Sequence, residues 1–302
     1  MGDLIINFTP TGMIPTKAMT PRVPISVQEI IEDVLRAHEI GITLVHLHAR
    51  NERTEVPIQD ADVYGRIIEG IRKVTQDLVI GVSLSGRNVT EFERRTAPLT
   101  LDGQLKPDMA SLTLSSLNFN RQASVNSPDM ITALATAMTE RGIKPELEAF
   151  DAGMLNYAKY LIHKELLHPP HYVNLLFGNV ACAQPTLLHA GVVLQDLPAD
   201  TLWAFAGIGN AQVVMNSIAI AYGGGVRVGL EDNIWYDAGR TRLATNADLV
   251  QRIHVIAEAN GRSLMSPGEF RRAMHLRPGG AEGYGCARPQ SERVNDFETA
   301  GV

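Results

Sequence analysis

Short apolar runs alternate with amphipathic stretches along most of this chain. An apolar run of strand length, or one in which every second residue is polar, is typical of a buried or half-buried strand. These runs predict eight strands, at Leu4–Thr9, Ile42–Arg50, Leu78–Ser85, Met109–Ser115, Pro145–Asp151, Tyr172–Gly178, Leu202–Gly209 and Val226–Glu231.

The stretches between the runs carry apolar residues at helical spacing. They predict helices at Val27–His38, Tyr64–Thr75, Pro128–Glu140, Met154–Leu166, Pro185–Leu194, Gln212–Ala221 and Asn246–Ala259. The first of these helices starts behind Ser26, a good N-cap residue, and is followed by Gly41. Residues 89–99 are a poorer helix candidate, because Pro98 and a cluster of charges interrupt them.

Eight strands separated by crossover segments predict a parallel sheet of the α/β class, and eight such repeats indicate a closed (β/α)8 TIM barrel. An open doubly wound sheet is the second interpretation, although such sheets normally have fewer strands. No shift in composition divides residues 1–276, so we expect a single barrel domain. Residues 277–302 contain glycines and prolines with few apolar side chains. They predict a C-terminal tail, for which an arm on a neighbouring subunit is one conceivable role.

Each of five predicted strands has one apolar and one polar face. In the second strand, His46, His48 and Arg50 share a face, and the residues between them are apolar. The same alternation sets further polar residues on one face of other strands: Ser83, Ser85, Ser111, Thr113, Glu146, Glu148, Arg227 and Glu231. Barrel strands bury one face under helices and turn the other into the lumen. We therefore expect these polar side chains at the carboxyl ends of the strands, where barrel enzymes build their sites.

Composition narrows the classes of function. The chain has 302 residues and a net charge of −6, so electrostatic binding to nucleic acid is not expected. It has no apolar stretch of membrane-spanning length, and its N-terminus lacks the layout of a signal peptide. The two cysteines, Cys182 and Cys286, do not have the spacing of a metal or redox pair. These features predict a cytoplasmic protein without a membrane partner.

His46 and His48 are the leading candidates for metal ligands. Their side chains leave a strand on the same side, about 6–7 Å apart along the backbone, so two imidazoles can converge on one ion. Two histidines and a carboxylate would form the three-ligand site with an open position that is typical of catalytic Zn²⁺. Glu146, Glu148 and Glu231 are the candidate carboxylates, and Glu231 has the best position because the eighth strand adjoins the first. Core histidines satisfied by hydrogen bonds are the structural alternative.

Asp232 and Arg227 extend this candidate site. Asp232 follows the eighth strand and can turn inward as a base that Arg227 orients. An ion pair with Arg227 is the structural alternative for Glu231. Two acids and an arginine beside a divalent cation indicate an anionic, chelating substrate.

Hydroxyl side chains on the third and fourth strands suit hydrogen bonds to a carboxylate or a developing oxyanion. Ser83, Ser85 and Thr113 are the candidates, whereas Ser111 is expected to be a satisfied hydroxyl in the lumen. The segment Ala206–Asn210 precedes a helix, so its backbone amides could bind a phosphate group. A tight turn without a ligand is the alternative for this segment.

An ordered set of segments resembles the β-keto acid cleavage enzymes, the family of 3-keto-5-aminohexanoate cleavage enzyme. The matching segments are Thr9–Gly12, Pro24, Val45–Arg50, Ser83–Gly86, Ala110–Thr113, Pro145–Asp151 and Val226–Asn233. The resemblance covers nearly the whole chain. It implies a zinc-containing (β/α)8 barrel that assembles into homo-oligomers, usually tetramers or larger.

The resemblance also implies a reaction. A β-keto acid and acetyl-CoA would condense, and a retro-Claisen cleavage would then release acetoacetate and a new acyl-CoA. At the matching positions, His46, His48 and Glu231 would hold Zn²⁺. Asp232, positioned by Arg227, would remove a proton from the carbon between the two carbonyls.

The remaining roles implied by the resemblance concern the substrate. Its carboxylate or oxyanion would be bound by a group of four residues: Ser83, Ser85, Gly86 and Thr113. Whether Ser83 or Ser85 corresponds to the family's serine stays open, as does the choice between Glu146 and Glu148. Glu146 is the one we expect to be catalytic or to support the polar site.

One departure from the family bears on the substrate. Members that act on the aminated β-keto acid carry an acidic residue where this chain has Ile14. Met13 and Ile14 offer an ammonium group only hydrocarbon, so we expect a β-keto acid with a neutral or apolar side chain.

Two other classes of function remain. A metal-dependent amidohydrolase also uses a His-x-His pair in a barrel, but normally on the first strand and with further histidines at later strand ends. A non-enzymatic binding protein would not need an acid–base pair beside a set of metal ligands.

Overall fold

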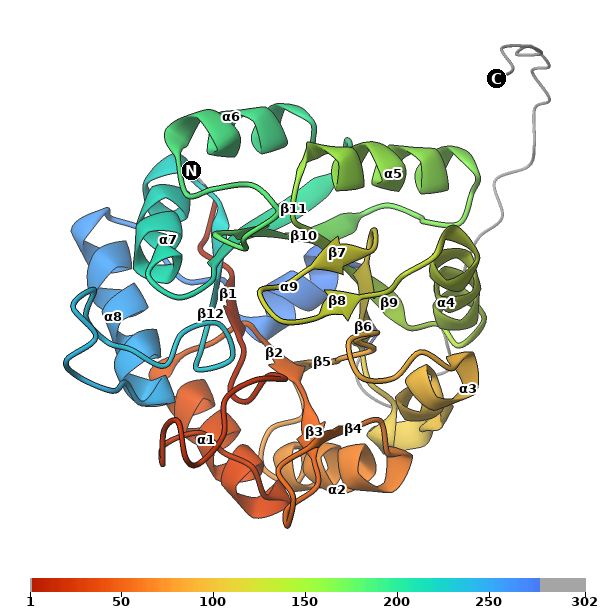
Figure 1. Cartoon of the computed structure of the whole chain (residues 1–302), viewed down its shortest axis with the longest axis horizontal. Helices are drawn as coiled ribbons and strands as arrows, with labels where there is room; N and C mark the ends of the chain where they lie inside the picture. Colours follow the sequence, from red (N-terminus) through yellow and green to blue (C-terminus); the bar gives the residue numbers. More distant parts are fainter. Residues whose placement is uncertain (1, 278–302) are drawn as a thin grey trace.

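The computed structural model describes residues 2–277, and it is a closed barrel (Figure 1). Eight parallel strands close in the order β1-β12-β11-β10-β9-β6-β5-β2. Their bounds are β1 (Ile6–Phe8), β2 (Leu44–Leu47), β5 (Val79–Val82), β6 (Met109–Thr113), β9 (Lys144–Ala149), β10 (His171–Phe177), β11 (Thr201–Gly207) and β12 (Gly225–Val228). The predicted TIM barrel is confirmed, and the open sheet is wrong. Except for Arg277, the predicted tail lies outside the described residues.

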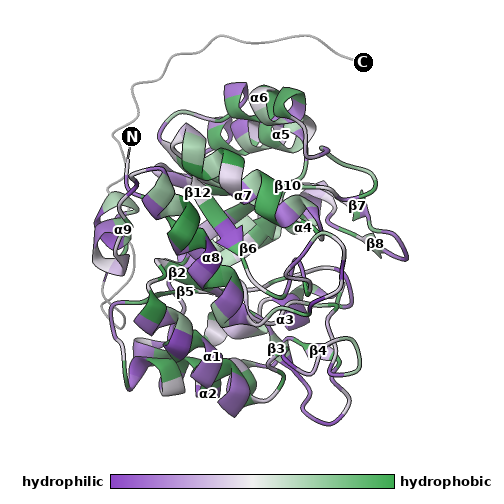
Figure 2. Cartoon of the chain, turned by 90° about the vertical axis from the view of Figure 1, so that its left-hand side faces the viewer, coloured by the Kyte–Doolittle hydropathy of each residue, from purple (hydrophilic) through white to green (hydrophobic). Residues whose placement is uncertain are grey.

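Helices surround the strands on the outside of the barrel (Figure 1). They are α1 (Val27–Ile40), α2 (Ala61–Arg72), α3 (Phe92–Arg95), α4 (Pro128–Glu140), α5 (Ala152–His163), α6 (Leu187–Gln195), α7 (Ala211–Tyr222) and α8 (Asn246–Ala259). Helix α1 begins where predicted because the Ser26 hydroxyl accepts the Glu29 N–H and the Glu29 carboxylate accepts the Ser26 N–H. In Figure 2, α1 and α2 mix hydrophilic and hydrophobic residues, whereas α7 is largely hydrophobic. None of the described helices is long and apolar enough to span a membrane.

Strands β2 and β12 end earlier than predicted, and both end beside the polar face of the lumen. Strand β2 stops at Leu47, and β3 (Ala49–Arg50) leaves the barrel to pair antiparallel with β4 (Pro57–Ile58). Strand β12 stops at Val228, and the chain then turns back, with the Asn233 N–H donating to the Gly229 carbonyl. The ends of these strands therefore act as loops that can aim side chains across the cavity.

Residues 89–99 form little helix, as the sequence predicts, whereas two features between β5 and α4 were not predicted. Residues 89–99 contain only the short α3 and the start of a 3-10 turn at 97–100, as the proline and charges there favour. A second 3-10 turn spans 103–105. Strands β7 (Leu117–Asn118) and β8 (Ala123–Ser124) form a hairpin after β6. This hairpin stands beside the carboxyl end of the barrel (Figure 1).

The sequence analysis also missed α9 (Pro267–Ala273), which closes the amino-terminal end of the barrel. Phe270, Met274 and Leu276 pack on the first inward residues of six strand segments: Ile5, Leu44, Val79, Met109, Tyr172 and Ala204. Arg271 donates two hydrogen bonds of 2.8 Å to the Asp108 carboxylate. Apolar burial and a buried ion pair thus seal this end and leave the carboxyl end for a site.

Candidate functional site

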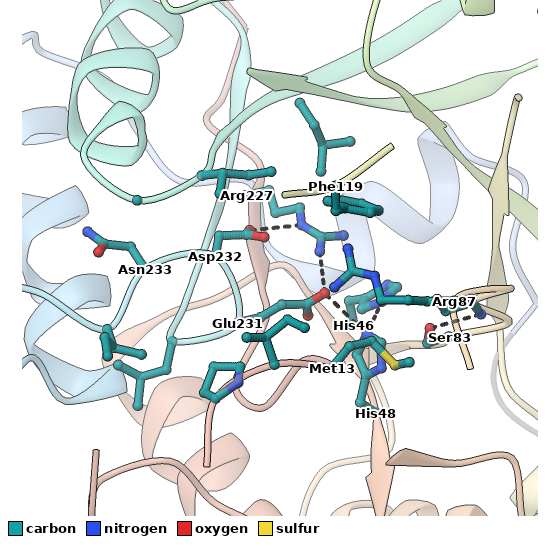
Figure 3. Close-up of a pocket in the computed structure, with 18 of the residues that line it drawn as sticks. Met13, His46, His48, Ser83, Arg87, Phe119, Arg227, Glu231, Asp232 and Asn233 are labelled. Atoms are coloured by element: carbon teal, nitrogen blue, oxygen red, sulfur yellow. Dashed lines mark hydrogen bonds and ion pairs between the residues drawn. The ribbon is translucent and has the colours of Figure 1, made fainter. Parts of the chain in front are cut away.

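A cavity of about 320 Å³ lies at the carboxyl ends of the strands (Figure 3). Residues at the ends of β2, β6 and β9 line it, together with the loops that follow β5, β11 and β12. Its polar floor is the lumen face that the alternation in the sequence predicts. Its walls include the apolar side chains of Met13, Ile14 and Met19.

His46, His48 and Glu231 converge at the bottom of this cavity. The two imidazole Nε2 atoms are 3.2 Å apart, and His48 Nε2 is 3.1 Å from Glu231 Oε1. Ligand atoms of a tetrahedral zinc ion, each about 2.0–2.1 Å from the metal, are about 3.3 Å apart. Glu231 Oε2 is buried without a hydrogen-bond partner. The spacing and this unsatisfied oxygen both fit a divalent metal held by the three residues.

A hydrogen bond from below fixes the orientation of His46. Its Nδ1 lies 2.8 Å from Glu146 Oε2, and the other oxygen of Glu146 accepts from the amides of Asn7 and Asn174, both at 2.6 Å. A carboxylate on Nδ1 turns Nε2 toward the ion, as in many carboxylate–histidine–metal arrangements. Glu146 is therefore a support for His46.

The charges of the two histidines differ because their surroundings differ. Burial would lower the pKa of His46, but the adjacent Glu146 carboxylate outweighs it and raises that pKa to about 9. Burial dominates at His48 and lowers its pKa, although Glu231 opposes the change. A bound metal would therefore have to displace a proton from His46.

Arg227 links the three carboxylates of the cavity. Its Nε donates to Asp232 at 3.1 Å, its Nη1 to Glu148 at 3.1 Å and its Nη2 to Glu231 at 2.7 Å. The guanidinium is almost fully buried, and the surrounding carboxylates keep its pKa well above the usual value despite that burial. One fixed cation thus spaces three acids around the floor of the cavity.

Asp232 and Glu231 are neighbours in sequence but have opposite shifts. Burial raises the pKa of Asp232 to about 6, with Arg227 opposing the rise and Glu231 adding to it. The pKa of Glu231 is held well below its usual range because Arg227 and His48 outweigh the effect of burial. Glu231 suits a metal ligand, and Asp232 suits a general base that works near neutral pH.

Close packing at Gly12 sets the position of Glu231. Gly12 has a φ of +66°, and any Cβ there would collide with the side chain of Glu231. The buried Arg50 donates to the carbonyls of Gly12 and Pro15, both at 2.8 Å. Arg50, two residues after His48 on the same lumen-facing pattern, thereby holds the loop that carries Met13 and Ile14.

The hydroxyl candidates also lie at the cavity, with different partners. The Thr113 hydroxyl donates to Glu148 Oε2 at 2.8 Å. This hydrogen bond uses the only proton of the hydroxyl group. Ser83 Oγ accepts the Ser85 N–H at 3.3 Å, so its proton can be donated into the cavity. Ser111 does not line the cavity and accepts the Leu84 N–H, as expected for a structural hydroxyl.

Two of the candidate site residues, Gly86 and Glu146, lie outside the cavity wall. Gly86 does not line the cavity; a Cβ there would come within 2.7 Å of Arg95 Nη1 and the Val125 carbonyl, so the glycine permits close packing. Glu146 also lies outside the cavity wall, completely buried beneath His46, and Glu148 is the glutamate of β9 that lines it.

The sequence left two interpretations of the segment Ala206–Asn210, a phosphate site and a tight turn. Two backbone amides of this segment, those of Ile208 and Gly209, already donate within the protein, and so do the first two amides of α7, at residues 211 and 212. Gly207 is needed because a Cβ would collide with the backbone of Ala211. A tight turn describes the segment better than a phosphate cradle.

Sequence reasoning missed part of the cavity wall. Arg87, Phe119, Trp235 and Arg240 line it, and they come from loops or from the β7–β8 hairpin. Such residues follow no periodic pattern. The one available signal was the position of Arg87, directly behind a segment that matched the family.

A family model for the β-keto acid cleavage enzyme matches residues 3–276. The chain belongs to this family. It is 36% identical over 275 residues to the 3-oxoadipate:acetyl-CoA acetyltransferase of Cupriavidus necator, covering 90% of this chain and 94% of that protein. It is 33% identical over 280 residues to the 3-keto-5-aminohexanoate cleavage enzyme of Fusobacterium nucleatum, covering 92% and 99%. The prediction of an enzyme of the β-keto acid cleavage family is confirmed.

Solved structures share the fold. ObcA in a ternary complex with C4-CoA adduct and oxalate aligns with a TM-score of 0.77 and 20% identity, over 86% of this chain and 68% of ObcA. Apo ObcA aligns with a TM-score of 0.72 over 66% of its own length. At this level of identity the likeness shows the barrel alone.

The β-keto acid cleavage family leaves the amidohydrolase alternative without support. An amidohydrolase site would also need histidines beyond the first pair. Within residues 2–277, the histidines that line the cavity are His46 and His48.

Zinc titration tests the metal ligands. His48→Ala removes one of the three candidate ligands, so the affinity of the variant for one Zn²⁺ per chain should fall further than the roughly 10- to 100-fold typical of losing a supporting residue. For Glu146→Gln, the loss of Zn²⁺ affinity should lie within that 10- to 100-fold range, because Glu146 supports a ligand and is not one itself. Competition with a chromogenic chelator measures both. His163→Ala, at an exposed position on α5, is the control and should bind like the wild type. Wild-type affinity in His48→Ala would contradict the assignment.

Proposed function

We propose that this chain is a zinc-dependent β-keto acid cleavage enzyme that uses acetyl-CoA as co-substrate. A β-keto acid and acetyl-CoA would yield acetoacetate and a new acyl-CoA. One observation carries the proposal: in a member of this family, His46, His48 and Glu231 meet Asp232 and Arg227 in one cavity.

Bound Zn²⁺ would supply Lewis-acid charge for the keto and carboxylate oxygens of the substrate. The chain itself supplies the base. Asp232 Oδ2 is held by Arg227, which leaves Oδ1 to take a proton from the carbon between the two carbonyls. Because the pKa of Asp232 is about 6, it is mostly ionised at neutral pH and can still hold the proton transiently.

Hydroxyl groups would bind the anionic end of the substrate. Ser83 has a proton to donate to the substrate carboxylate. Thr113, whose proton is engaged by Glu148, can accept but not donate, so it orients Glu148 beside Arg227. We therefore assign carboxylate binding to Ser83 and a positioning role to Thr113.

The bond changes balance without a further reactant. The deprotonated carbon attacks the acetyl carbonyl of acetyl-CoA and releases CoA, which adds to the original keto carbon. The bond between that keto carbon and the deprotonated carbon then breaks. The acetyl group remains on the fragment that carries the carboxylate, and this fragment is released as acetoacetate. The original acyl group is released as the new acyl-CoA. Asp232 is positioned to return its proton to the acetoacetate carbon.

The cavity wall argues against an aminated substrate. Met13 and Ile14 line the cavity and bring no acidic group to an ammonium ion. Burying an uncompensated ammonium against hydrocarbon is strongly unfavourable. The substrate carbons that contact this wall are expected to be uncharged.

Helix α6 supports assembly into a homo-oligomer, proposed as a tetramer or larger. Leu187 and Leu188 at its start are each 74% exposed, and Val192 one turn later is 44% exposed. Apolar residues gathered on one helix are typical of a surface covered by another subunit. We propose α6 as part of that interface.

Product analysis tests the activity. Zinc-loaded protein is incubated with acetyl-CoA and a panel of β-keto acids, and CoA esters are followed by mass spectrometry. The account predicts a new acyl-CoA and acetoacetate in equal amounts. For 3-keto-5-aminohexanoate, kcat/KM should be at least about tenfold lower, a penalty of about 1.4 kcal/mol.

Chelator-treated protein, assayed before and after zinc is restored, is the control for that experiment. Absence of acyl-CoA with every substrate would contradict the proposed activity. Equal turnover of the aminated compound would contradict only the substrate preference.

Light scattering after size exclusion tests the α6 interface. The wild type should have a mass of at least four chains, and Leu187→Asp combined with Leu188→Asp should dissociate it, because charge would be buried at the contact. Val255→Asp, at a position on α8 that is 66% exposed, is the matched control and should keep the wild-type mass. An unchanged mass in the double variant, or a monomeric wild type, would rule the interface out.

A further inference from the structure

Arg87 is a charged side chain of the cavity that the proposed reaction does not use. It lies in the loop after β5, and its guanidinium has no hydrogen-bond or ion-pair partner among the described residues. Its Nε is buried without an acceptor. The carboxylates of Glu148, Glu231 and Asp232 are all engaged by Arg227. The cavity therefore presents a guanidinium that is available to an anionic ligand.

Neighbouring groups hold Arg87 in place. Its guanidinium lies 3.5 Å from the centroid of the Phe119 ring, a close cation–π contact. Its N–H donates to Ser85 Oγ at 3.3 Å, and its carbonyl accepts from Gln122 Nε2 at 2.9 Å. Since backbone and side chain are both fixed, little ordering remains to be done when an anion binds.

The position of Arg87 favours the far end of a substrate. Figure 3 shows it reaching into the cavity from the side of Ser83, between Phe119 and Met13 in that view. Arg240 also lines the cavity without a side-chain partner, but it is exposed, and water weakens an exposed charge. Of these two arginines, Arg87 is the better receptor.

We propose that Arg87 binds a second carboxylate, so that the preferred substrates are β-keto dicarboxylic acids, whose carbon chain ends in a carboxylate remote from the β-keto acid group. This inference rests on the proposed function. The methylene carbons pack against Met13 and Ile14, and the terminal carboxylate meets the guanidinium with paired hydrogen bonds. A terminal carboxylate on the substrate takes the place of the uncharged chain end that the sequence predicts. A substrate ammonium would face the like charge of Arg87, which is a further reason to expect that the aminated substrate is poor.

A matched pair of substrates tests the proposal. 3-Oxohexanedioate and its 6-amide have the same shape and differ in one negative charge. The wild type should have the higher kcat/KM for the diacid. In Arg87→Met, the ratio of the two kcat/KM values should fall roughly 10- to 100-fold, as expected for loss of charge-assisted hydrogen bonds. Arg240→Met, which removes the other unpaired arginine, is the control and should keep the wild-type ratio.

Two results would overturn the proposal. A wild-type ratio in Arg87→Met would mean that the residue serves a group common to both substrates, such as the β-keto carboxylate. A ratio that changes in Arg240→Met instead would move the receptor to that residue.

Calorimetry separates this proposal from the proposed function. Hexanedioate and its monoamide cannot react, so their binding does not depend on turnover. If neither oxo acid is converted by the zinc-loaded wild type, the proposed function fails. Tighter binding of hexanedioate that is lost in Arg87→Met would still support the carboxylate site, and equal binding of the two compounds would refute it.

Discussion

The buried guanidinium of Arg227 sets the arrangement of the cavity. It donates to Asp232, Glu148 and Glu231, three carboxylates that would repel one another without it. Removing one partner from a buried network of this kind typically costs about 3–5 kcal/mol. Arg227 binds one oxygen of each carboxylate. The second oxygen of Glu148 accepts from Thr113, whereas Glu231 Oε2 is buried without a partner, and the Glu231 oxygen bound to Arg227 also lies 3.1 Å from His48 Nε2.

The pattern of polar and apolar residues along the strands predicted this arrangement, because the alternation of side chains between the two faces of a strand is a strict geometric rule. Alternate residues of a strand share a face, so His46, His48 and Arg227 could be placed in the lumen from the sequence. The same rule put Glu146 and Glu148 on one face without distinguishing them. Glu146 lies one layer of side chains deeper in the barrel than Glu148, and this difference separates their roles. The depth of a residue depends on how neighbouring strands are staggered around the barrel, and the sequence of one strand does not specify that stagger.

Other parts of the molecule depend on contacts that have no periodicity. Helix α9 closes the barrel through Phe270 and the Arg271–Asp108 pair, which join segments far apart in the sequence. Arg87 matters because Phe119, from a different loop, stacks on its guanidinium. Gly86 matched a family segment, and only the packing against Arg95 explains why glycine is present there. Long-range contacts of this kind appear only in the folded chain.

Hydrogen exchange at the substrate carbon tests the central claim, that this site removes a proton from the carbon between two carbonyls. The zinc-loaded protein is mixed with a β-keto acid in D₂O without acetyl-CoA, and the C2 protons are followed by NMR. We predict exchange well above the rate in buffer for the wild type, and the buffer rate for Asp232→Asn with its zinc still bound. Equal exchange in the wild type and in Asp232→Asn would contradict the account.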